Sequence, residues 1–483
     1  MKQAKSLMIA TFWSYLGELS ARLAPPITTL LASRFLVPAE FGTIAAALML
    51  STFCQIFWEA GLNKALVQRA SHLSEAFNFA FLFNIATACM LCIVINSQAE
   101  IIAISIFNDD KVSVVINYMC IYILFGAASS APIALLQKAL NFRFLFFVRF
   151  TTAWTSMGLS VLLLSYDYGY MSLIYGLLAS NIIQFVLLFN RIRENFTFEF
   201  DLKVSVQMLQ YCSWVFLTAV LSWLFLWLDA LIIAKYLGPS DLGLYRMASQ
   251  IAMFGMILIF MPIQPVLFAE LSARNSRGEK IDYFGSRVIK LAAIVAIPLA
   301  VGLAIFSSEV LSLLLGDKWK NADFIFSMLI LMHGFSWIVG FNGEFYRAIG
   351  KPKLETIVNA GVIGLYLITY FSIIAYGIEI FTAGRFLLSL IALIFHLLLF
   401  SHYFNLNLAR NFWDIFLYTT ISTVISGASY VIISKFVNLN IEIYFVISML
   451  MSMLLTYFII FHFMERHLFD FFRRKILNKL NFL

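Results

Sequence analysis

The sequence predicts an all-α polytopic membrane protein with about 14 transmembrane helices, and three observations lead to this fold class. Hydrophobic residues make up 62% of the chain and charged residues only 12%, about half the charged fraction of an ordinary soluble domain. Apolar runs long enough to cross a bilayer recur along the chain, because a helical span needs about 20 residues. A short motif also occurs twice at a fixed offset, which indicates an internal duplication.

The first expected span, residues 8–32, carries both charges and prolines. Its polar side chains share one helical stripe because they follow one another at intervals of three, four or seven: Thr11, Ser14, Glu18, Arg22, Thr29 and Ser33. A charged side chain at the bilayer centre costs roughly 2.5–3.5 kcal/mol. We therefore expect Glu18 and Arg22 to pair and to face a wet or protein-lined interior. Pro25 and Pro26 predict a bend.

This first span is expected to stay in the mature protein. Only Met1 to Ser6 precede it, and no small-residue cleavage site follows it, so it does not have the pattern of a removable signal peptide.

The duplicated motif is Arg34-Phe-Leu-Val-Pro-Ala-Glu-Phe-Gly42, which matches Lys235-Tyr-Leu-Gly-Pro-Ser-Asp-Leu-Gly243 at an offset of 201. The match continues with Gly61–Leu66, which aligns with Pro262–Leu267 at the same offset. Further along the chain, Lys138 aligns with Arg347. Six spans separate the partners, so both copies cross the membrane in the same direction. This predicts two six-helix bundles related by a pseudo-two-fold axis along the membrane normal, plus two C-terminal helices.

The expected organisation follows from this repeat. It comprises an N-terminal six-helix bundle (1–190), a cytoplasmic linker (191–210), a C-terminal six-helix bundle (211–403), two extra transmembrane helices (404–463) and a basic amphipathic cytoplasmic tail (464–483). In the tail, Phe469, Phe472, Ile476 and Leu480 share one face, which suits a helix lying on an anionic leaflet. An ordinary positively charged tail is the alternative.

The basic residues set the orientation. With both termini inside, most of the 33 Lys and Arg residues fall in the inside segments, as the positive-inside rule requires. The net charge of +7 therefore reports topology and predicts no nucleic-acid partner. We count Arg22 and Arg385 as the basic residues buried within spans.

Further polar groups recur on single helical faces. Gln55 and Glu59 extend a stripe in the second span, although Glu59 can also mark the membrane interface. Asp229 shares a face with Thr218 and Ser222, and its alternative interpretation is an acid that snorkels outward. A second kink is expected at the end of the eighth span, at Pro262 and Pro265.

The later spans add two histidines and two further charges. Glu344 and Arg347 can pair at i, i+3 in the tenth span, and Arg347 can also snorkel inward. His333 is either a packing residue or a proton carrier. Arg385 and His396 share a face in the twelfth span.

Several kinds of chemistry lack their motifs. The chain has no GxxxxGK[ST] phosphate-binding loop and no zinc-binding Cys/His spacing. The outside loops are too short for the platform of a membrane glycosyltransferase. The five cysteines lie in or beside apolar spans, where we interpret them as small apolar residues. We expect no enzyme, no metal site and no cofactor.

Four segments carry a resemblance to a known family: Arg34–Gly42, Gly61–Arg69, Asp229–Tyr245 and Leu315–Trp319. Together with the two parallel bundles and two added spans, they resemble the polysaccharide transporter family. Its members are the Wzx-type flippases of the multidrug/oligosaccharidyl-lipid/polysaccharide exporter superfamily. Arg22 matches the family's habit of placing arginines in the first span.

The resemblance implies a bacterial inner-membrane flippase. It would move an undecaprenyl-diphosphate-linked oligosaccharide by alternating access, for O-antigen, capsule or exopolysaccharide synthesis. The expected coupling ion is H+ or Na+. The expected partners are the lipid-linked oligosaccharide, membrane lipids, and polysaccharide polymerase or chain-length machinery.

The candidate translocation cavity combines the charged and polar positions within spans: Glu18, Arg22, Gln55, Glu59, Asp229, Glu344, Arg347 and Arg385. Two other functions stay open. An ion-coupled multidrug antiporter shares the architecture but would favour an acidic or aromatic cavity. A membrane glycosyltransferase or polymerase would need an acidic pair in a large outside loop, where Asp109 and Asp110 are the adjacent acids.

Overall fold

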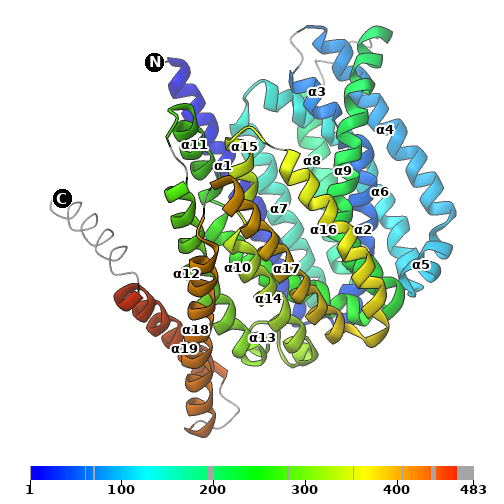
Figure 1. Ribbon diagram of the computed structural model, residues 1–483. Coiled ribbons are helices and arrows are strands. Elements are labelled where there is room, and N and C mark those ends of the chain that lie inside the picture. Colours follow the sequence, from blue (N-terminus) through cyan, green and yellow to red (C-terminus); the bar gives the residue numbers. More distant parts are fainter. Residues whose placement is uncertain are drawn as a thin grey trace. The chain divides into compact units, whose positions relative to one another are not determined.

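The computed structural model describes residues 2–59, 61–68, 71–192, 201–279, 282–351, 353–404, 406–436 and 442–464. Throughout these ranges the chain forms helices joined by turns, and no strand occurs in them (Figure 1). The predicted all-α fold class is confirmed. The amphipathic tail expected at 464–483 lies, apart from its first residue, outside the described residues, and so do residues 193–200 of the expected linker.

Two compact units make up the chain, Met1–Arg246 and Met247–Leu483. The first contains nine helices and the start of a tenth: α1 (Lys2–Ser33), α2 (Pro38–Glu59), α3 (Leu62–Gln68), α4 (Leu73–Ser97), α5 (Ala99–Phe107), α6 (Lys111–Lys138), α7 (Phe142–Ser165), α8 (Met171–Ile192), α9 (Leu202–Leu237) and α10 (Pro239–Phe260).

The second unit continues from α10 and holds the remaining elements. These are α11 (Ile263–Ser276), α12 (Asp282–Ile305), α13 (Ser307–Leu315), the 3-10 helix η2 (Asp317–Ala322), α14 (Asp323–Ile338), α15 (Asn342–Ala348), α16 (Lys353–Ile373), the 3-10 helix η3 (Ile374–Tyr376), α17 (Ile378–Phe404), α18 (Leu408–Phe436), α19 (Glu442–Ile459) and the π-helical turn η4 (Ile460–Met464).

Thirteen helical stretches among the described residues are long and apolar enough to cross a membrane. The first helix, α1, is 32 residues long but is not one of the 13. Together with α1, these stretches occupy each segment that the sequence predicts as a span. Both Pro25 and Pro26 lie inside the continuous helix α1, so the prolines do not end it.

The order and the breaks of the helices repeat along the chain. Helix α2 is followed by the short α3, and α10 is followed by α11 across a break at Pro262, where the sequence predicts a kink. Likewise α4 passes into α5 at Gln98, and α12 passes into α13 at Phe306. The helix order α1–α8 therefore recurs from α9 to α17, with the continuous α6 replaced by the interrupted pair α14 and α15.

In the first unit, α6 is the central helix. It packs against α2, α3, α4, α5 and α8, while α7 joins α1 to α8. Helix α9 packs on α2, α3, α4 and α5, although the repeat assigns it to the C-terminal bundle. The compact units thus divide at residue 246, whereas the bundle boundaries inferred from the repeat remain a prediction.

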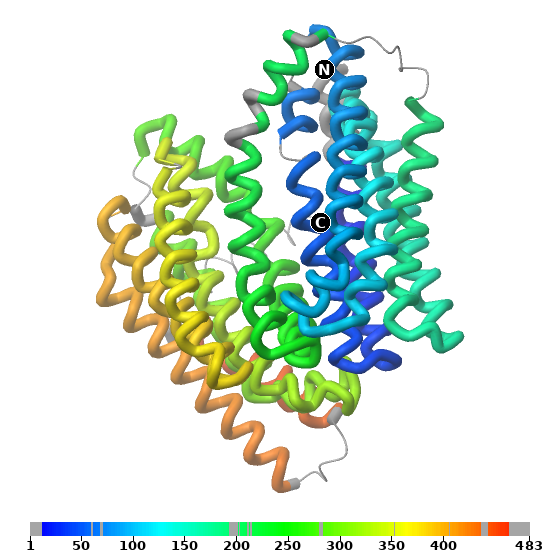
Figure 2. Tube along the Cα trace, turned by 90° about the vertical axis from the view of Figure 1, so that its right-hand side faces the viewer, coloured from blue at the N-terminus to red at the C-terminus, as the bar shows by residue number. Residues whose placement is uncertain are grey.

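In the second unit, α12 and α14 pack on each other and α14 packs on α17. Figure 2 shows α16, α17 and α18, coloured yellow to orange, alongside one another. The extra helices α18 and α19 dock on α12. Polar contacts reinforce this docking, because Lys290 pairs with Asp414 at 3.2 Å and the Tyr457 hydroxyl donates to the Val295 carbonyl at 2.9 Å.

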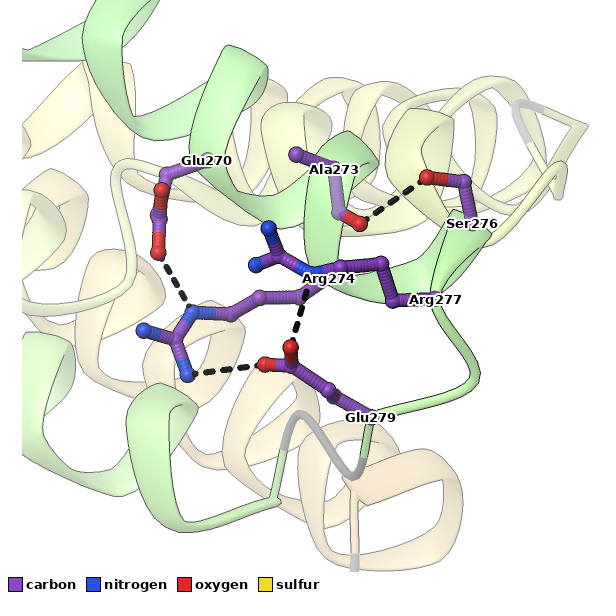
Figure 3. A network of polar contacts seen from close by, with 6 residues as sticks. All are labelled: Glu270, Ala273, Arg274, Ser276, Arg277 and Glu279. Atoms are coloured by element: carbon purple, nitrogen blue, oxygen red, sulfur yellow. Dashed lines mark hydrogen bonds and ion pairs between the residues drawn. The ribbon is translucent and has the colours of Figure 1, made fainter.

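The end of α11 is held by a group of ion pairs (Figure 3). Arg274 lies between Glu270 at 2.7 Å and Glu279 at 3.5 Å, and Arg277 contacts Glu279 at 2.7 Å. These side chains are between 31% and 57% exposed, so each pair contributes about 1 kcal/mol or less. The Asn275 side chain donates to the Ala348 carbonyl at 3.1 Å and thereby ties α11 to the end of α15.

Candidate functional site

A carboxylate shared by two arginines lies on α1 and α7 of the first unit. One carboxylate oxygen of Glu18 lies 2.9 Å from the Arg22 guanidinium, and its other oxygen lies 2.8 Å from the Arg149 guanidinium. The predicted pairing of Glu18 with Arg22 is confirmed. The group carries a net positive charge, since two guanidinium groups share one carboxylate.

Helices α1 and α7 come close together at Gly17. A Cβ there would lie 3.4 Å from the Phe146 Cα and 3.5 Å from the Arg149 Cδ. The Arg149 side chain therefore runs across the glycine to reach Glu18, one residue further along α1. A second contact fixes the two helices beyond the ion pair, where the Trp154 indole donates to the Ser20 hydroxyl at 3.0 Å.

The three charged side chains stay accessible within their unit. Arg22 is 44% exposed, Glu18 47% and Arg149 33%. Aromatic rings flank them, with Trp13 5.1 Å from Phe146 and Phe150 5.8 Å from Trp154. The Arg143 guanidinium lies 5.8 Å from the Trp13 ring. The α1–α7 surface thus combines guanidinium groups, which bind phosphate oxygens in pairs, with aromatic faces.

Asp229 occupies a different environment from the other predicted site residues. It is only 3% exposed, so the interpretation as a snorkelling acid is wrong. Its carboxylate accepts hydrogen bonds from the Tyr245 hydroxyl and, at 2.7 Å, from the Ala230 backbone amide. The Arg246 guanidinium lies 4.0 Å above the Trp227 ring. This cluster binds α9 to α10 inside the first unit.

In the second unit, Arg347 lies between two acids. It contacts Glu344 at 2.9 Å, as its sequence spacing predicts, and Glu355 at 3.2 Å. Gly343 leaves room for this arrangement, because a Cβ there would be 2.7 Å from a Glu355 carboxylate oxygen. The three residues join α15 to the start of α16, and their net charge is negative.

The remaining predicted residues are dispersed. Gln55 is half-buried on α2, and Arg385 is half-buried on α17. Glu59 is the last residue of α2, and its side chain lies outside the described part of the structure. The structure thus brings together Glu18 with Arg22, and Glu344 with Arg347, while the lining of one common cavity by all eight residues remains a prediction.

The count of basic residues within spans needs correction. Arg22 and Arg385 are joined there by Arg149 on α7, Arg246 on α10 and Lys290 on α12. Each of these three lies within about two turns of a helix end. Arg149 is the missed residue that matters most, and its signal was a charge inside the apolar run 144–163.

The duplicated motif forms a reciprocal contact in the first unit. Pro38 and Pro239 begin α2 and α10, where proline's missing amide hydrogen leaves no helical bond unmade. A Cβ on Gly42 would lie 1.8 Å from the Pro239 carbonyl oxygen, and one on Gly243 would lie 1.8 Å from the Pro38 carbonyl oxygen. The first turns of the two helices therefore touch backbone to backbone.

The acid of each motif copy lies in the first turn of its helix: Glu40 on α2 and Asp241 on α10. Glu40 accepts a hydrogen bond from the Val37 backbone amide at 2.9 Å. Negative side chains near helix N-termini are stabilised by the helix dipole.

Tyr170 lies nearby, in the turn before α8. Its partial burial and the carboxylates of Asp109 and Glu40 raise the pKa of its phenol.

Spanning helices with paired breaks and half-buried charges define the class of this protein, a multi-pass membrane protein with a transporter fold. The chain belongs to the polysaccharide biosynthesis protein family, whose model matches residues 30–323. It is 21% identical over 415 residues to the teichuronic acid biosynthesis protein TuaB of Bacillus subtilis, covering 85% of this chain and 86% of that protein.

Two solved structures share the fold. The lipid II flippase MurJ in an inward closed conformation matches with a TM-score of 0.75 and 18% identity, covering 96% of this chain and 99% of that one. An inward-facing MATE family multidrug resistance transporter matches with a TM-score of 0.61 and 11% identity, over 79% of this chain and 95% of that one. The resemblance inferred from the sequence motifs is confirmed.

Proposed function

We propose that this protein is a flippase that moves an undecaprenyl-diphosphate-linked oligosaccharide across the bacterial inner membrane for surface polysaccharide synthesis. Family membership and the fold support this function, and the observation that carries it is the Arg22–Glu18–Arg149 group. A diphosphate faces a large desolvation cost in hydrocarbon. A carrier must therefore offer fixed positive charge in a wet environment.

The geometry of the group suits both binding and release. Two guanidinium groups can each bind phosphate oxygens with two parallel hydrogen bonds. In this structure Glu18 occupies the places that two anionic oxygens would take. A substrate diphosphate thus competes with an internal carboxylate, which keeps binding modest enough for release on the other side.

The flanking aromatic side chains add a second type of contact. Trp13, Phe147 and Trp154 lie on the same pair of helices as the arginines. Their flat faces suit the apolar faces of sugar rings or the first prenyl units of the carrier lipid. We place the diphosphate at the arginines and the groups that flank it against these rings.

An ion-coupled multidrug antiporter is the competing function, because a MATE transporter shares the fold. Such a protein binds organic cations, which an exposed pair of arginines repels. The Glu344–Arg347–Glu355 group has the opposite sign, and it is the feature of the described residues that favours this alternative.

Reconstitution tests the function directly. Purified protein in proteoliposomes should make a labelled polyprenyl-diphosphate oligosaccharide in the inner leaflet accessible to a glycosidase added outside, whereas protein-free liposomes should not. Uptake of an organic cation without movement of the lipid-linked oligosaccharide would instead identify a multidrug transporter.

The proposed orientation places both termini in the cytoplasm. Reporter fusions after Asn108, Tyr168 and Trp319 should then be active in the periplasm, and fusions after His72 and Arg277 should be active in the cytoplasm. Two or more sites with the reverse result would refute this topology. The Arg22–Glu18–Arg149 assignment depends on side-chain contacts and would survive such an inversion.

A further inference from the structure

We infer that His396, together with Asn342 and Tyr346, forms a proton-binding site at the interrupted span of the second unit. The site lies where α14 ends at Ile338 and α15 begins at Asn342. A helix interrupted inside a membrane protein is a place where side chains replace backbone hydrogen bonds. His396 of α17 contacts two side chains of α15 at this break, and its imidazole is the group whose charge changes between pH 5 and 8 when it is unperturbed.

The three side chains make a closed hydrogen-bonded set. The Asn342 amide nitrogen lies 3.0 Å from the Nε2 and 3.3 Å from the Nδ1 of His396, and the Tyr346 hydroxyl lies 3.1 Å from Nδ1. His396 is 7% exposed and Tyr346 is 0% exposed. Both ring nitrogens thus have a partner away from water.

These partners can serve either charge state of the ring. A neutral imidazole needs one donor and one acceptor, and an imidazolium needs two acceptors. The tyrosine hydroxyl can donate or accept by rotating, and the asparagine side chain can present its oxygen after a half-turn of the amide. A proton can therefore bind at His396 without leaving either ring nitrogen unpaired.

A second histidine in the same unit does not have hydrogen-bond partners of this kind. His333 on α14 is half-buried, and its Nε2 atom is buried with no hydrogen-bond partner among the described residues. A proton added there would create a buried, unsatisfied donor, which costs free energy comparable to a lost hydrogen bond or more. The difference between the two environments assigns proton binding to His396 and packing to His333.

Several charged groups on the helices around α17 are already paired among themselves. On α15 and α16, Glu344 and Glu355 share Arg347, and on α18 Asp414 pairs with Lys290. The same helices carry further titratable groups: Asp323 and His333 on α14, Tyr346 on α15, Lys353, Tyr366 and Tyr370 on α16, Glu379, Arg385, His402 and Tyr403 on α17, and Arg410, Tyr418, Tyr430 and Lys435 on α18. The two acids in this set, Asp323 and Glu379, lie in the first turns of α14 and α17, and Glu379 is about 25 Å along the helix from His396. An imidazolium at His396 would therefore be an uncompensated charge in the closed arrangement.

Because an imidazolium at His396 would have no negative partner, binding of a proton there affects the conformation of the break between α14 and α15. Trp337 covers the break, because a Cβ on Gly340 would lie 2.5 Å from its ring. Burying an unpaired charge is unfavourable, so protonation favours arrangements in which the site is hydrated. The closed arrangement is therefore favoured as pH rises, and opening of residues 339–349 is favoured as pH falls.

Hydrogen exchange across residues 339–349 tests the inference on purified protein in nanodiscs, with no substrate present. After correction for the intrinsic pH dependence of amide exchange, opening should increase between pH 8 and pH 5, by at most about tenfold per pH unit for one proton. His396→Gln should abolish this pH dependence. Tyr346→Phe, which removes one acceptor, should displace it to lower pH.

The matched control is His333→Gln, which should retain the pH dependence of the wild type. The inference is overturned if His396→Gln, folded by circular dichroism, opens with the same pH dependence as the wild type, or if His333→Gln is the variant that loses it. Because no substrate takes part, failure here leaves the proposed flippase function untouched, and failure of the flippase assay leaves this site untouched.

Discussion

Arg22→Ala is expected to stop export of the lipid-linked oligosaccharide, and Arg149→Ala is expected to do the same. Each change removes one guanidinium from the shared carboxylate Glu18 and leaves the pair neutral. A hydrogen bond to a charged group contributes roughly 1.5–3 kcal/mol, so binding of the diphosphate should weaken at least tenfold. Arg22→Lys should retain partial activity, because lysine keeps the charge but loses the planar fork. Glycan at the surface of a complemented null strain measures the effect.

Arg274→Ala is the control for these variants. Arg274 also lies between two glutamates, at 2.7 and 3.5 Å, but at the end of α11 (Figure 3). Its loss should leave export near the wild-type rate. Full export by the Arg22→Ala/Arg149→Ala double variant at normal expression would show that the arginines do not bind the headgroup, even for a protein that is still a flippase.

Gly243→Ala is expected to destabilise the first unit strongly. The new methyl group would lie 1.8 Å from the Pro38 carbonyl oxygen, so the backbones of α2 and α10 would have to separate. Overpacking of this kind typically costs about 1–3 kcal/mol, and here the obstacle is backbone, which cannot move aside like a side chain. Gly42→Ala should be equally harmful, because it meets the Pro239 carbonyl at the same distance. Thermal unfolding in detergent measures the loss.

Gly158→Ala on α7 provides the comparison for the glycine variants. Among the described residues, no atom outside the backbone of its own helix lies within 4 Å of the position of its added Cβ, and alanine in a helix interior is favoured over glycine by roughly 0.5–1 kcal/mol. This variant should unfold at the wild-type temperature or slightly above it. Equal melting temperatures for Gly243→Ala and Gly158→Ala would contradict the close contact.

Composition and periodicity were sufficient to predict the helices. Each predicted span is occupied by a helix, and the break at Pro262 lies between α10 and α11, because proline and hydrophobic length act locally. The interruption between α14 and α15 was not predicted. Its residues Val339, Gly340 and Phe341 resemble any apolar stretch, so neither composition nor periodicity marks the break.

The candidate site was predictable only within one helix. Glu18 with Arg22 and Glu344 with Arg347 followed from spacings of four and three residues. Arg149 could not be assigned to Glu18, because 131 residues separate them and only the close approach of α1 and α7 at Gly17 brings them together. Asp229 was predicted to line the cavity because it is an acid within a span. Its contact with Tyr245 could not be derived from spacing within one helix, because Tyr245 belongs to the next helix.

The reciprocal contact of Gly42 with Pro239 and of Gly243 with Pro38 has the form of an interface between two identical subunits. In a two-fold symmetric dimer, if residue i touches residue j of the other copy, then j touches i. The four residues obey this rule at the constant offset of 201. A side chain added at either glycine would meet the carbonyl of the other copy's proline, so neither copy of the motif can change this position without displacing the other.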